Sequence, residues 1–319
     1  MKNMFFPSSS SGTKTSALKL FLGGAIVAFL LIARPAIAQF SYDFNGGTDP
    51  GWTHYAPGTL GQTFSFPANP AGVGNLAYEL TSNTSGTDPG RVGSFRMGDP
   101  QIPDFTLKAD LINWNNGMSM NMGVMARVQS PLPGTTFPLG YALVYADRFS
   151  SGAGGTDQLR LYKVTTGGLS FMNTTTLGSQ TNGNQGRFGI VAGGSAPPDP
   201  SKDYQLIFTG KGNLLTGQII DKSTGLALTF DNGSGGLTDR IMASDPGAAG
   251  FGAAGATLYN TGDYGVFGFV GSGTGSLGNN TDFTIDNFSI IPEPSTLTIA
   301  GLGLLGFFAL NARRLKRSL

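Results

Sequence analysis

The sequence predicts an all-β protein, folded as a two-sheet antiparallel sandwich, and three observations carry this prediction. Apolar and polar residues alternate along many short segments, which is the pattern of half-buried antiparallel strands. Glycine accounts for 50 of the 319 residues and clusters between these segments, as expected of turns that join short strands. The middle of the chain shows no 3.6-residue apolar stripe longer than about two turns, so helices are not expected there.

The longest alternation runs from Met118 to Val128, with Asn121 and Arg127 on its polar face. Other strands are expected at Phe40–Phe44, Gln62–Phe66, Leu76–Leu80, Arg91–Met97, Phe105–Leu111, Tyr141–Arg148, Leu159–Val164, Tyr204–Phe208, Gly217–Asp221, Leu226–Phe230, Tyr264–Val270 and Phe283–Ile290. Two connections rich in Gly, Pro or Ala, Ser179–Lys202 and Asp231–Asp263, are expected to be long loops. So many short strands favour a sandwich.

The last predicted strand changes its apolar face partway along. Phe283 and Ile285 point to one side, whereas Phe288 and Ile290 have the opposite parity. A continuous core face therefore requires one extra residue, a β-bulge, at the Asp286-Asn287 step. The first predicted strand is the expected partner of this last one, because that pairing places both ends of the domain at one edge.

Three short sequences carry a family resemblance: Tyr42-Asp43-Phe44 followed by Trp52, Tyr204-Gln205-Leu206, and Ile285-Asp286-Asn287-Phe288. In these features the chain resembles the concanavalin A-like lectin/glucanase superfamily, in its laminin-G-like jelly-roll forms. The resemblance implies a jelly-roll sandwich over residues 39–291. A pair of immunoglobulin-like sandwiches is the alternative.

Residues 1–38 have the features of a secretory signal peptide. Lys14 and Lys19 precede the apolar run Leu20–Ala33, and Ala36-Ile37-Ala38 is an A-x-A-like cleavage site that leaves Gln39 as the first mature residue. A signal peptide implies export through the Sec machinery.

Residues 292–319 have three parts in a fixed order. Pro292-Glu293-Pro294-Ser295 is expected to stop any strand and to form an extended, accessible joint, because proline lacks an amide hydrogen. The uncharged run Thr296–Ala312 is long enough for a short transmembrane helix, and Arg313 and Arg314 begin a basic tail on the cytoplasmic side. An ordinary tail anchor would leave the Pro-Glu-Pro step unexplained.

This order resembles the PEP-CTERM sorting signal of Gram-negative bacteria. The resemblance implies a precursor anchored in the inner membrane and processed by an exosortase. It also implies a final location at the cell surface, the outer envelope or the extracellular matrix. Families with this signal often accompany exopolysaccharide production, so a role in a biofilm matrix is expected.

Removing both ends leaves an acidic domain. Each end takes four of the 20 cations and the tail takes one of the 19 carboxylates, so residues 39–291 keep 12 Lys and Arg against 18 Asp and Glu. This balance argues against binding to nucleic acid or to an anionic membrane surface. The chain has no cysteine, so its stability must come from the core rather than from disulfides.

The inventory of catalytic side chains is short. His54 is the single histidine, so a zinc site built on several His or Cys is not expected, and no Gly-x-Ser-x-Gly elbow accompanies it. Glycoside hydrolysis requires two carboxyl groups. Asp104 with Asp110, or Asp282 with Asp286, would share a face of a regular strand. A non-catalytic protein is favoured over an enzyme.

Binding is better supported than catalysis. The aromatic residues expected to be partly exposed are Trp52, Tyr55, Trp114, Tyr141 and Tyr145. The segment Asn113-Trp114-Asn115-Asn116-Gly117 is expected to form a hairpin turn between two strands, with Trp114 either in the core or against a sugar ring. The candidate ligand-binding residues are Asn113, Trp114, Asn115, Trp52 and Tyr145.

A structural Ca²⁺ is a further option, because calcium is a common companion of the superfamily that the chain resembles. Asp43 and Asp286 are weak candidate ligands. The favoured function is an exported surface or matrix protein that binds glycan or exopolysaccharide. The alternatives are a glycan-cleaving enzyme that uses an Asp pair and a structural surface protein without a small ligand.

Overall fold

The computed structural model describes residues 39–57, 61–70, 75–83, 90–116, 119–130, 138–147, 156–165, 168–171, 186–231, 235–245, 258–270 and 280–293. These residues form strands, turns and loops without a helix. No segment among them is therefore a helix of the length and hydropathy needed to cross a bilayer. The predicted signal peptide, the apolar run 296–312 and the basic tail lie outside the described residues.

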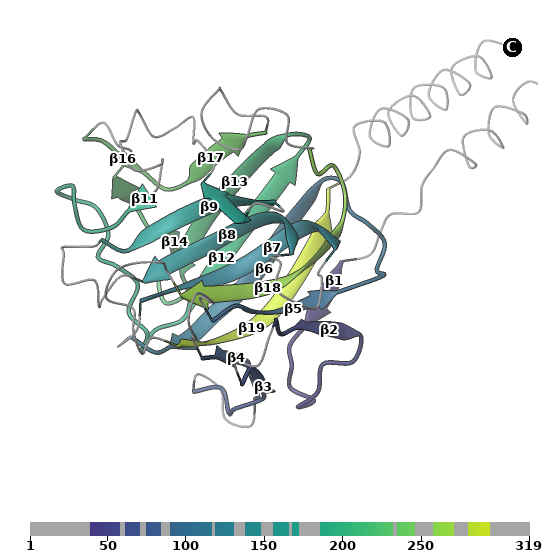
Figure 1. Cartoon of the computed structure of the whole chain (residues 1–319). Helices are drawn as coiled ribbons and strands as arrows, with labels where there is room; N and C mark the ends of the chain where they lie inside the picture. The colour runs from purple at the N-terminus through teal and green to yellow at the C-terminus, as the bar shows by residue number, and fades with distance from the viewer. Residues whose placement is uncertain are drawn as a thin grey trace, which may run out of the picture. The chain divides into compact units, whose positions relative to one another are not determined.

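The strands form two antiparallel sheets, as predicted (Figure 1). The nine-stranded sheet has the order β14 (Leu226–Ala227), β13 (Leu214–Asp221), β12 (Tyr204–Lys211), β6 (Phe105–Trp114), β19 (Thr281–Pro292), β4 (Tyr78–Ser82) and β3 (Thr63–Ser65), with β1 (Phe40–Tyr42) beside β19 and β17 (Ile241–Ser244) beside β13. The ten-stranded sheet has the order β16 (Leu237–Thr238), β15 (Phe230–Asp231), β11 (Gly186–Arg187), β9 (Gln158–Thr165), β8 (Leu139–Asp147), β7 (Met120–Ser130), β18 (Asp263–Val270), β5 (Val92–Arg96) and β2 (Trp52–Tyr55), with β10 (Gly168–Phe171) beside β9.

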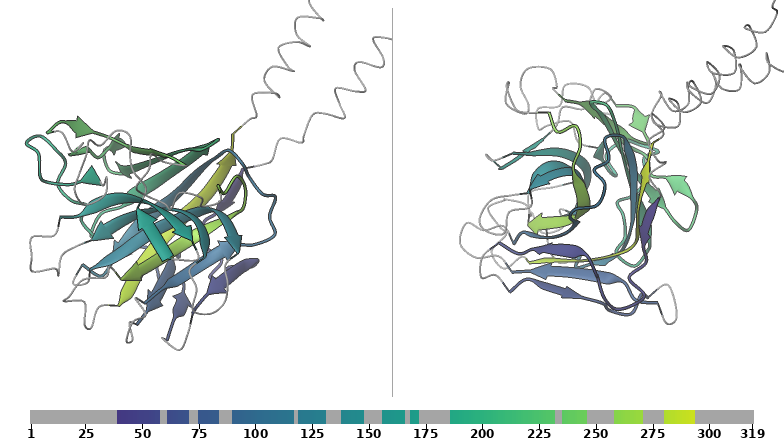
Figure 2. Two further views of the ribbon diagram at one scale, coloured as in Figure 1. Left: turned by 45° about the horizontal axis from the view of Figure 1, so that its top comes forward. Right: turned by 90° about the vertical axis from the view of Figure 1, so that its right-hand side faces the viewer.

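The two sheets lie face to face (Figure 2). Consecutive strands belong to different sheets at each step from β4 through β5 and β6 to β7, and again from β18 to β19. Repeated crossing of this kind is the connectivity of a jelly roll. The predicted hairpin between β6 and β7 is wrong, because these two strands belong to different sheets. The connection that contains Asn115 therefore spans the sandwich edge, and Gly117 of the predicted turn lies outside the described residues.

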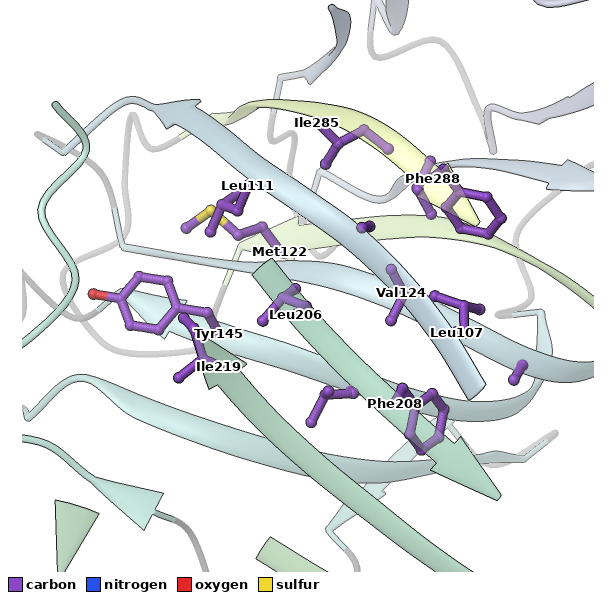
Figure 3. Close-up of a cluster of buried hydrophobic side chains, with 14 of the residues drawn as sticks. Leu107, Leu111, Met122, Val124, Tyr145, Leu206, Phe208, Ile219, Ile285 and Phe288 are labelled. Atoms are coloured by element: carbon purple, nitrogen blue, oxygen red, sulfur yellow. The ribbon is translucent and has the colours of Figure 1, made fainter. Parts of the chain in front are cut away.

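The main core fills the space between the sheets (Figure 3). Leu107 and Leu111 from the nine-stranded sheet pack in one cluster with Met122, Val124 and Tyr145 from the ten-stranded sheet, and all five are buried. Burying one large apolar side chain contributes roughly 1.5–3 kcal/mol relative to leaving it exposed. This cluster therefore fixes which face of each strand points inward.

The ten-stranded sheet is apolar on its outer face as well. A second buried cluster there includes Phe95, Met125, Tyr162, Phe267 and Phe269, which alternate along their strands with the residues of the main core. A strand that is buried on both faces shows a nearly continuous apolar run rather than a clean alternation. Every residue of β18 is buried in this way.

β19 contains the bulge that its sequence predicts. The register with β6 shifts between Asp286 and Ser289, and Asn287 at this step has φ 48°. The bulge lets Phe288 and Ile285 both enter the core despite their opposite parity. β1 pairs with β19 through Phe40 and Tyr42, as expected for the first and last strands.

A bulge that the sequence did not predict lies in β7. The register with β8 shifts after Ala126, and Arg127 has φ 53°. The alternation predicted for Met118–Val128 is therefore wrong beyond Ala126, where Val128 joins the outer cluster. Arg127 is 2% exposed and donates Nε and Nη2 hydrogen bonds to the carbonyl oxygen of Pro103, at 3.0 and 2.6 Å.

The long connections are more structured than expected. Short strands β11, β15, β16 and β17 interrupt the predicted loops Ser179–Lys202 and Asp231–Asp263. β2, around His54, was not predicted, because its two central residues are both exposed and give no alternation.

Candidate functional site

A groove of about 630 Å³ lies on the outer face of the nine-stranded sheet, beside β1. We call it the outer-face groove. Its floor includes Lys108 of β6, Gln205 of β12, and Asn287 and Ser289 of β19. Its wall is built by residues between Gln39 and Trp52, which include β1 and the turn that follows it.

Strand alternation and register place a polar row across this groove. Leu107 points into the core, so its neighbour Lys108 points to the outer face. Lys108 is opposite Ser289, and Ser289 is opposite Ser41. The half-buried Lys108 side chain has no hydrogen bond or ion pair with any residue that the structure describes. Its ammonium group is therefore available to a ligand.

A buried carboxylate holds part of the groove floor in place. Asp110 Oδ1 accepts a 2.9 Å hydrogen bond from Gln205 Nε2, and Asp110 Oδ2 accepts one of the same length from Asn287 Nδ2. Lys222 Nζ forms an ion pair with Asp110 at 2.5 Å. Asp110 is only 2% exposed, whereas Lys222 and Asn287 reach solvent. These partly buried, charge-assisted bonds position two floor residues.

Asp286 lies directly opposite Asp110 in the β19–β6 register and is also buried. Burial raises the pKa of the Asp286 carboxyl, and hydrogen bonds from the Asn287 amide and from Asn69 oppose this rise. Asn69 Nδ2 lies 2.8 Å from Asp286 Oδ2. The polar network therefore continues under the bulge.

Asp49 in the groove wall accepts hydrogen bonds from two other elements. His54 Nε2 lies 2.5 Å and the Tyr78 hydroxyl 2.6 Å from Asp49 Oδ2. Burial acts to raise the pKa of Asp49, but these hydrogen bonds outweigh it and the pKa is lowered. The fully buried Ser94 Oγ lies 3.0 Å from the Tyr78 hydroxyl oxygen, to which it donates, because the single hydroxyl hydrogen of Tyr78 goes to Asp49. Since Tyr78 separates Ser94 from His54, the four residues do not form a serine triad.

Trp52 forms the apolar part of the groove wall. Its ring packs edge-on against Tyr42 at 5.3 Å and Phe288 at 5.2 Å between centroids, and it is 9% exposed. Packing of this kind fixes the indole plane, while one edge of the residue still lines the groove.

The prediction of partly exposed aromatic rings is wrong. Trp52, Tyr55, Trp114, Tyr141 and Tyr145 are all buried. Their rings belong to the hydrophobic cores, and several of their indole NH or hydroxyl groups donate hydrogen bonds to carboxylates. Trp114 Nε1 donates to Asp147 Oδ2 at 2.8 Å, and the Tyr145 hydroxyl donates to Asp157 Oδ2 at 2.9 Å.

The structure divides the predicted ligand-binding residues into separate places. Trp114 and Tyr145 pack edge-on in the core at 5.5 Å between ring centroids. Asn113 is exposed near the end of β6, and the Asn115 amide donates to the carbonyl oxygen of Asp282. Only Trp52 of the five lines the outer-face groove.

The two predicted carboxylate pairs do not form accessible pairs. Asp104 precedes β6, whereas Asp110 is buried and bonded to Lys222. Two register shifts of β19 against β6 fall between Asp282 and Ser289. The carboxylates that the sheet does place opposite each other, Asp110 and Asp286, are both buried and hydrogen-bonded.

The part of the chain that the structure describes contains no group of three or more His, Cys, Asp or Glu arranged to hold a metal ion. Asp286 is surrounded by amide donors, which suit a carboxylate rather than a cation. Asp43 Oδ1 accepts the Asn45 amide hydrogen in a local turn.

Sequence reasoning missed the groove residues Lys108, Gln205 and Ser289. The alternation already placed Lys108 and Gln205 on the face opposite the core. What the sequence did not contain was the strand order, which brings β12, β6, β19 and β1 together.

Comparisons with known proteins bear on the C-terminal segment of the chain. The PEP-CTERM protein-sorting motif matches residues 291–314, which confirms the predicted sorting signal. It indicates an exported protein whose precursor is anchored in the membrane. A search of curated proteins finds no match.

Several solved structures are similar to most of this chain, at low identity and with TM-scores below 0.5. The carbohydrate-binding module CBM66 from Bacillus subtilis is 13% identical, with a TM-score of 0.40, over 75% of this chain and 94% of that one. Lectin II from Ulex europaeus is 8% identical, with a TM-score of 0.43, over 80% and 97%. Basic winged bean lectin with Tn-antigen is 10% identical, with a TM-score of 0.44, over 79% and 98%.

At such identities and scores these neighbours carry no argument about ligands. The chain itself combines an all-β jelly-roll sandwich with a PEP-CTERM protein-sorting motif at residues 291–314.

Proposed function

We propose that this protein is an exported, non-catalytic glycan-binding protein whose ligand lies in the outer-face groove. The observation that carries the proposal is the pre-formed polar floor of this groove. Lys108 offers an ammonium group that has no partner among the described residues, and Asp110 holds Gln205 and Asn287 in fixed positions. The groove volume of about 630 Å³ falls in the usual range for small-ligand sites.

The groove has the mixed character that sugars require. Ser41, Ser289 and Lys108 can hydrogen-bond hydroxyl groups, while the half-buried Tyr42 beside Trp52 offers apolar surface to the CH groups of a ring. The accompanying proposal for sorting is that the Sec machinery exports the chain and that an exosortase processes it near Pro292. Its final location would be the cell surface, the outer envelope or the matrix, in contact with exopolysaccharide.

The test is a glycan-array screen of the chain from Gln39 to Glu293, with and without Ca²⁺, that scores both retention and released sugar. Lys108→Ala is expected to weaken retention about tenfold, because a hydrogen bond to a charged group contributes roughly 1.5–3 kcal/mol. Ser41→Trp, which fills the groove from its edge, is expected to abolish retention. Lys211→Ala is the matched control, since Lys211 is exposed on the neighbouring β12 and does not line the groove.

Each other outcome would point to a different function. Retention that survives both groove variants would place the ligand elsewhere. Sugar release would establish a glycan-cleaving enzyme. No retention on a broad array would favour the structural surface protein, and a requirement for Ca²⁺ would establish a metal site among loop oxygens.

A further inference from the structure

The sorting motif begins inside the folded domain. Ile291 and Pro292 are the last two residues of β19, and they pair with Thr106 and Phe105 of β6. The sequence predicted instead that Pro292 stops the strand and starts an accessible joint, and this prediction is wrong. Strand pairing extends into the first residues of the motif match.

Proline is compatible with strand pairing at position 292 because the backbone nitrogen of this residue does not point toward β6. The Glu293 amide donates to the carbonyl oxygen of Asp104 at 2.9 Å, so it points toward β6. Successive amides of a strand point to opposite sides, and the nitrogen of Pro292 therefore faces away from β6. β1 pairs with β19 only as far as Ile290, so the missing amide hydrogen of Pro292 leaves no ladder bond unmade.

The motif glutamate is held by its side chain as well. Thr106 Oγ1 donates to Glu293 Oε1 at 2.8 Å. Together with the main-chain bond to Asp104, this contact fixes both the backbone and the carboxylate of Glu293. We call Asp104, Thr106 and Glu293 the motif clamp.

The clamp rests on a rigid base. Asp104 Oδ1 accepts the amide hydrogen of Gly212 at 2.8 Å, in the turn between β12 and β13. The preceding carbonyl, of Pro103, accepts two hydrogen bonds from Arg127. Arg127 reaches it from the unpredicted β7 bulge, at a positive φ that costs an ordinary residue roughly 1 kcal/mol or more. Two separate elements, the β12–β13 turn and β7, thus position Asp104, the residue that accepts the Glu293 amide hydrogen.

We propose that the motif clamp keeps the sorting motif folded onto β6, and that the membrane protease acts only after Ile291–Glu293 have left the sheet. This inference rests on the proposed processing by an exosortase. A protease that reads an extended peptide needs its backbone amides, carbonyls and side chains free. In this structure β6 pairs with one edge of the peptide, and Thr106 binds one oxygen of the exposed Glu293 carboxylate. Release is a local opening of the strand end, which costs less than global unfolding.

The first test changes the clamp without changing the motif. Thr106→Val removes the donor to Glu293 and keeps the side-chain volume. Pulse-chase conversion of the full-length precursor, in a host with its exosortase, is expected to become about fivefold faster, because one charge-assisted hydrogen bond is lost. Thr216→Val is the matched control, a half-exposed threonine on the same sheet that does not touch the motif.

The second test closes the clamp covalently. Thr106→Cys with Ile291→Cys joins directly opposed residues, whose Cα separation in a β-ladder suits a disulfide. Since the chain has no cysteine of its own, this bond forms without competitors. The oxidised precursor is expected to be processed at least about tenfold more slowly than the reduced one. Thr209→Cys with Thr216→Cys, a facing pair on β12 and β13, is the control.

The outcomes separate the two proposals. Equal processing of the oxidised clamp pair and the control pair would overturn the inference while leaving exosortase processing intact. If the unchanged precursor is not processed at all, the sorting proposal fails. In that case amide hydrogen exchange at Glu293 tests the clamp. The Glu293 amide is expected to be protected from exchange in the unchanged chain and to exchange about fivefold faster in Thr106→Val. Equal exchange in the two chains would reject the clamp.

Discussion

At two residues the backbone conformation differs from that of the regular strand on either side. Asn287 and Arg127 both adopt positive φ angles at bulges, and both turn a polar side chain toward a buried partner. Asn tolerates this backbone region better than most residues, because it has a short polar side chain that hydrogen-bonds locally. Its amide donates to Asp110 and Asp286, so the strain and the hydrogen bonds are coupled at one site.

Two substitutions separate these contributions. Asn287→Gly removes the amide and is expected to destabilise the domain by about 2 kcal/mol, because two buried carboxylates lose a donor. Asn287→Ala loses the same donor and is expected to cost about 1 kcal/mol more, because alanine resists positive φ. Chemical denaturation measures both free energies of unfolding. Equal stability of the two variants would show that the backbone at this bulge is unstrained.

β19 shows what one element contributes to the electrostatics of the sheet. It pairs with β6, β4 and β1, and carries two half-buried or buried carboxylates along its length. Burial raises the pKa of Asp282, and repulsion from Glu79 on β4 raises it further, against a hydrogen bond from Asn115. The folded state therefore binds this proton more tightly than the unfolded state does.

The sign of the resulting pH dependence follows from linkage. A folded-state pKa above the unfolded value of 3.8 contributes stability below that value, and this stability is lost as the pH rises through the folded pKa. Asp282→Asn cannot ionise, so it is expected to gain stability relative to the unchanged chain as the pH rises from about 4 toward 7. Urea unfolding over this range measures the difference.

Asp221 supplies a control of opposite sign. Hydrogen bonds from Ser223 lower the pKa of the Asp221 carboxyl, so its contribution is present above the unfolded value and lost as the pH falls. Asp221→Asn should therefore be less stable than the unchanged chain near pH 7 and match it in acid. The same pH trend in both asparagine variants would contradict the opposite directions assigned to the pKa shifts of Asp282 and Asp221.

The fold of the whole domain includes, in the middle of one sheet, the strand that is synthesised last, β19. β19 lies in the middle of the nine-stranded sheet, and its side chains Phe283, Ile285, Phe288 and Ile290 belong to the main core. The chain has no disulfide that could hold the rest together without it. Folding is therefore expected to wait for residues close to the sorting motif.

A truncation pair tests this dependence. A chain from Gln39 to Glu293 is expected to unfold cooperatively, whereas a chain ending at Asn280 should not fold, because β6 and β4 would lose the strand between them. Circular dichroism melting distinguishes the two. A cooperative transition in the shorter chain would show that the sandwich does not need its last strand. Reductant should leave the longer chain's transition unchanged.

The sequence by itself determined most of the long strands of this protein and its C-terminal sorting motif. Alternation predicted most of the long strands, and the parity change between Ile285 and Phe288 predicted the β19 bulge, because both patterns are local consequences of a two-residue repeat. The proline-glutamate-proline step, the apolar run and the basic tail identified the sorting motif through their resemblance to a known sorting signal.

Only the tertiary structure decided which residues surround each of these side chains. Trp114 and Tyr145 were candidates for partial exposure, with a core position left open for Trp114. The strand order buries both, and the Trp114 indole NH and the Tyr145 hydroxyl donate to aspartates. The outer-face groove and the motif clamp join residues from strands far apart in the chain, such as Thr106 and Glu293. Contacts of this kind follow from sheet order and register, which a local sequence pattern does not contain.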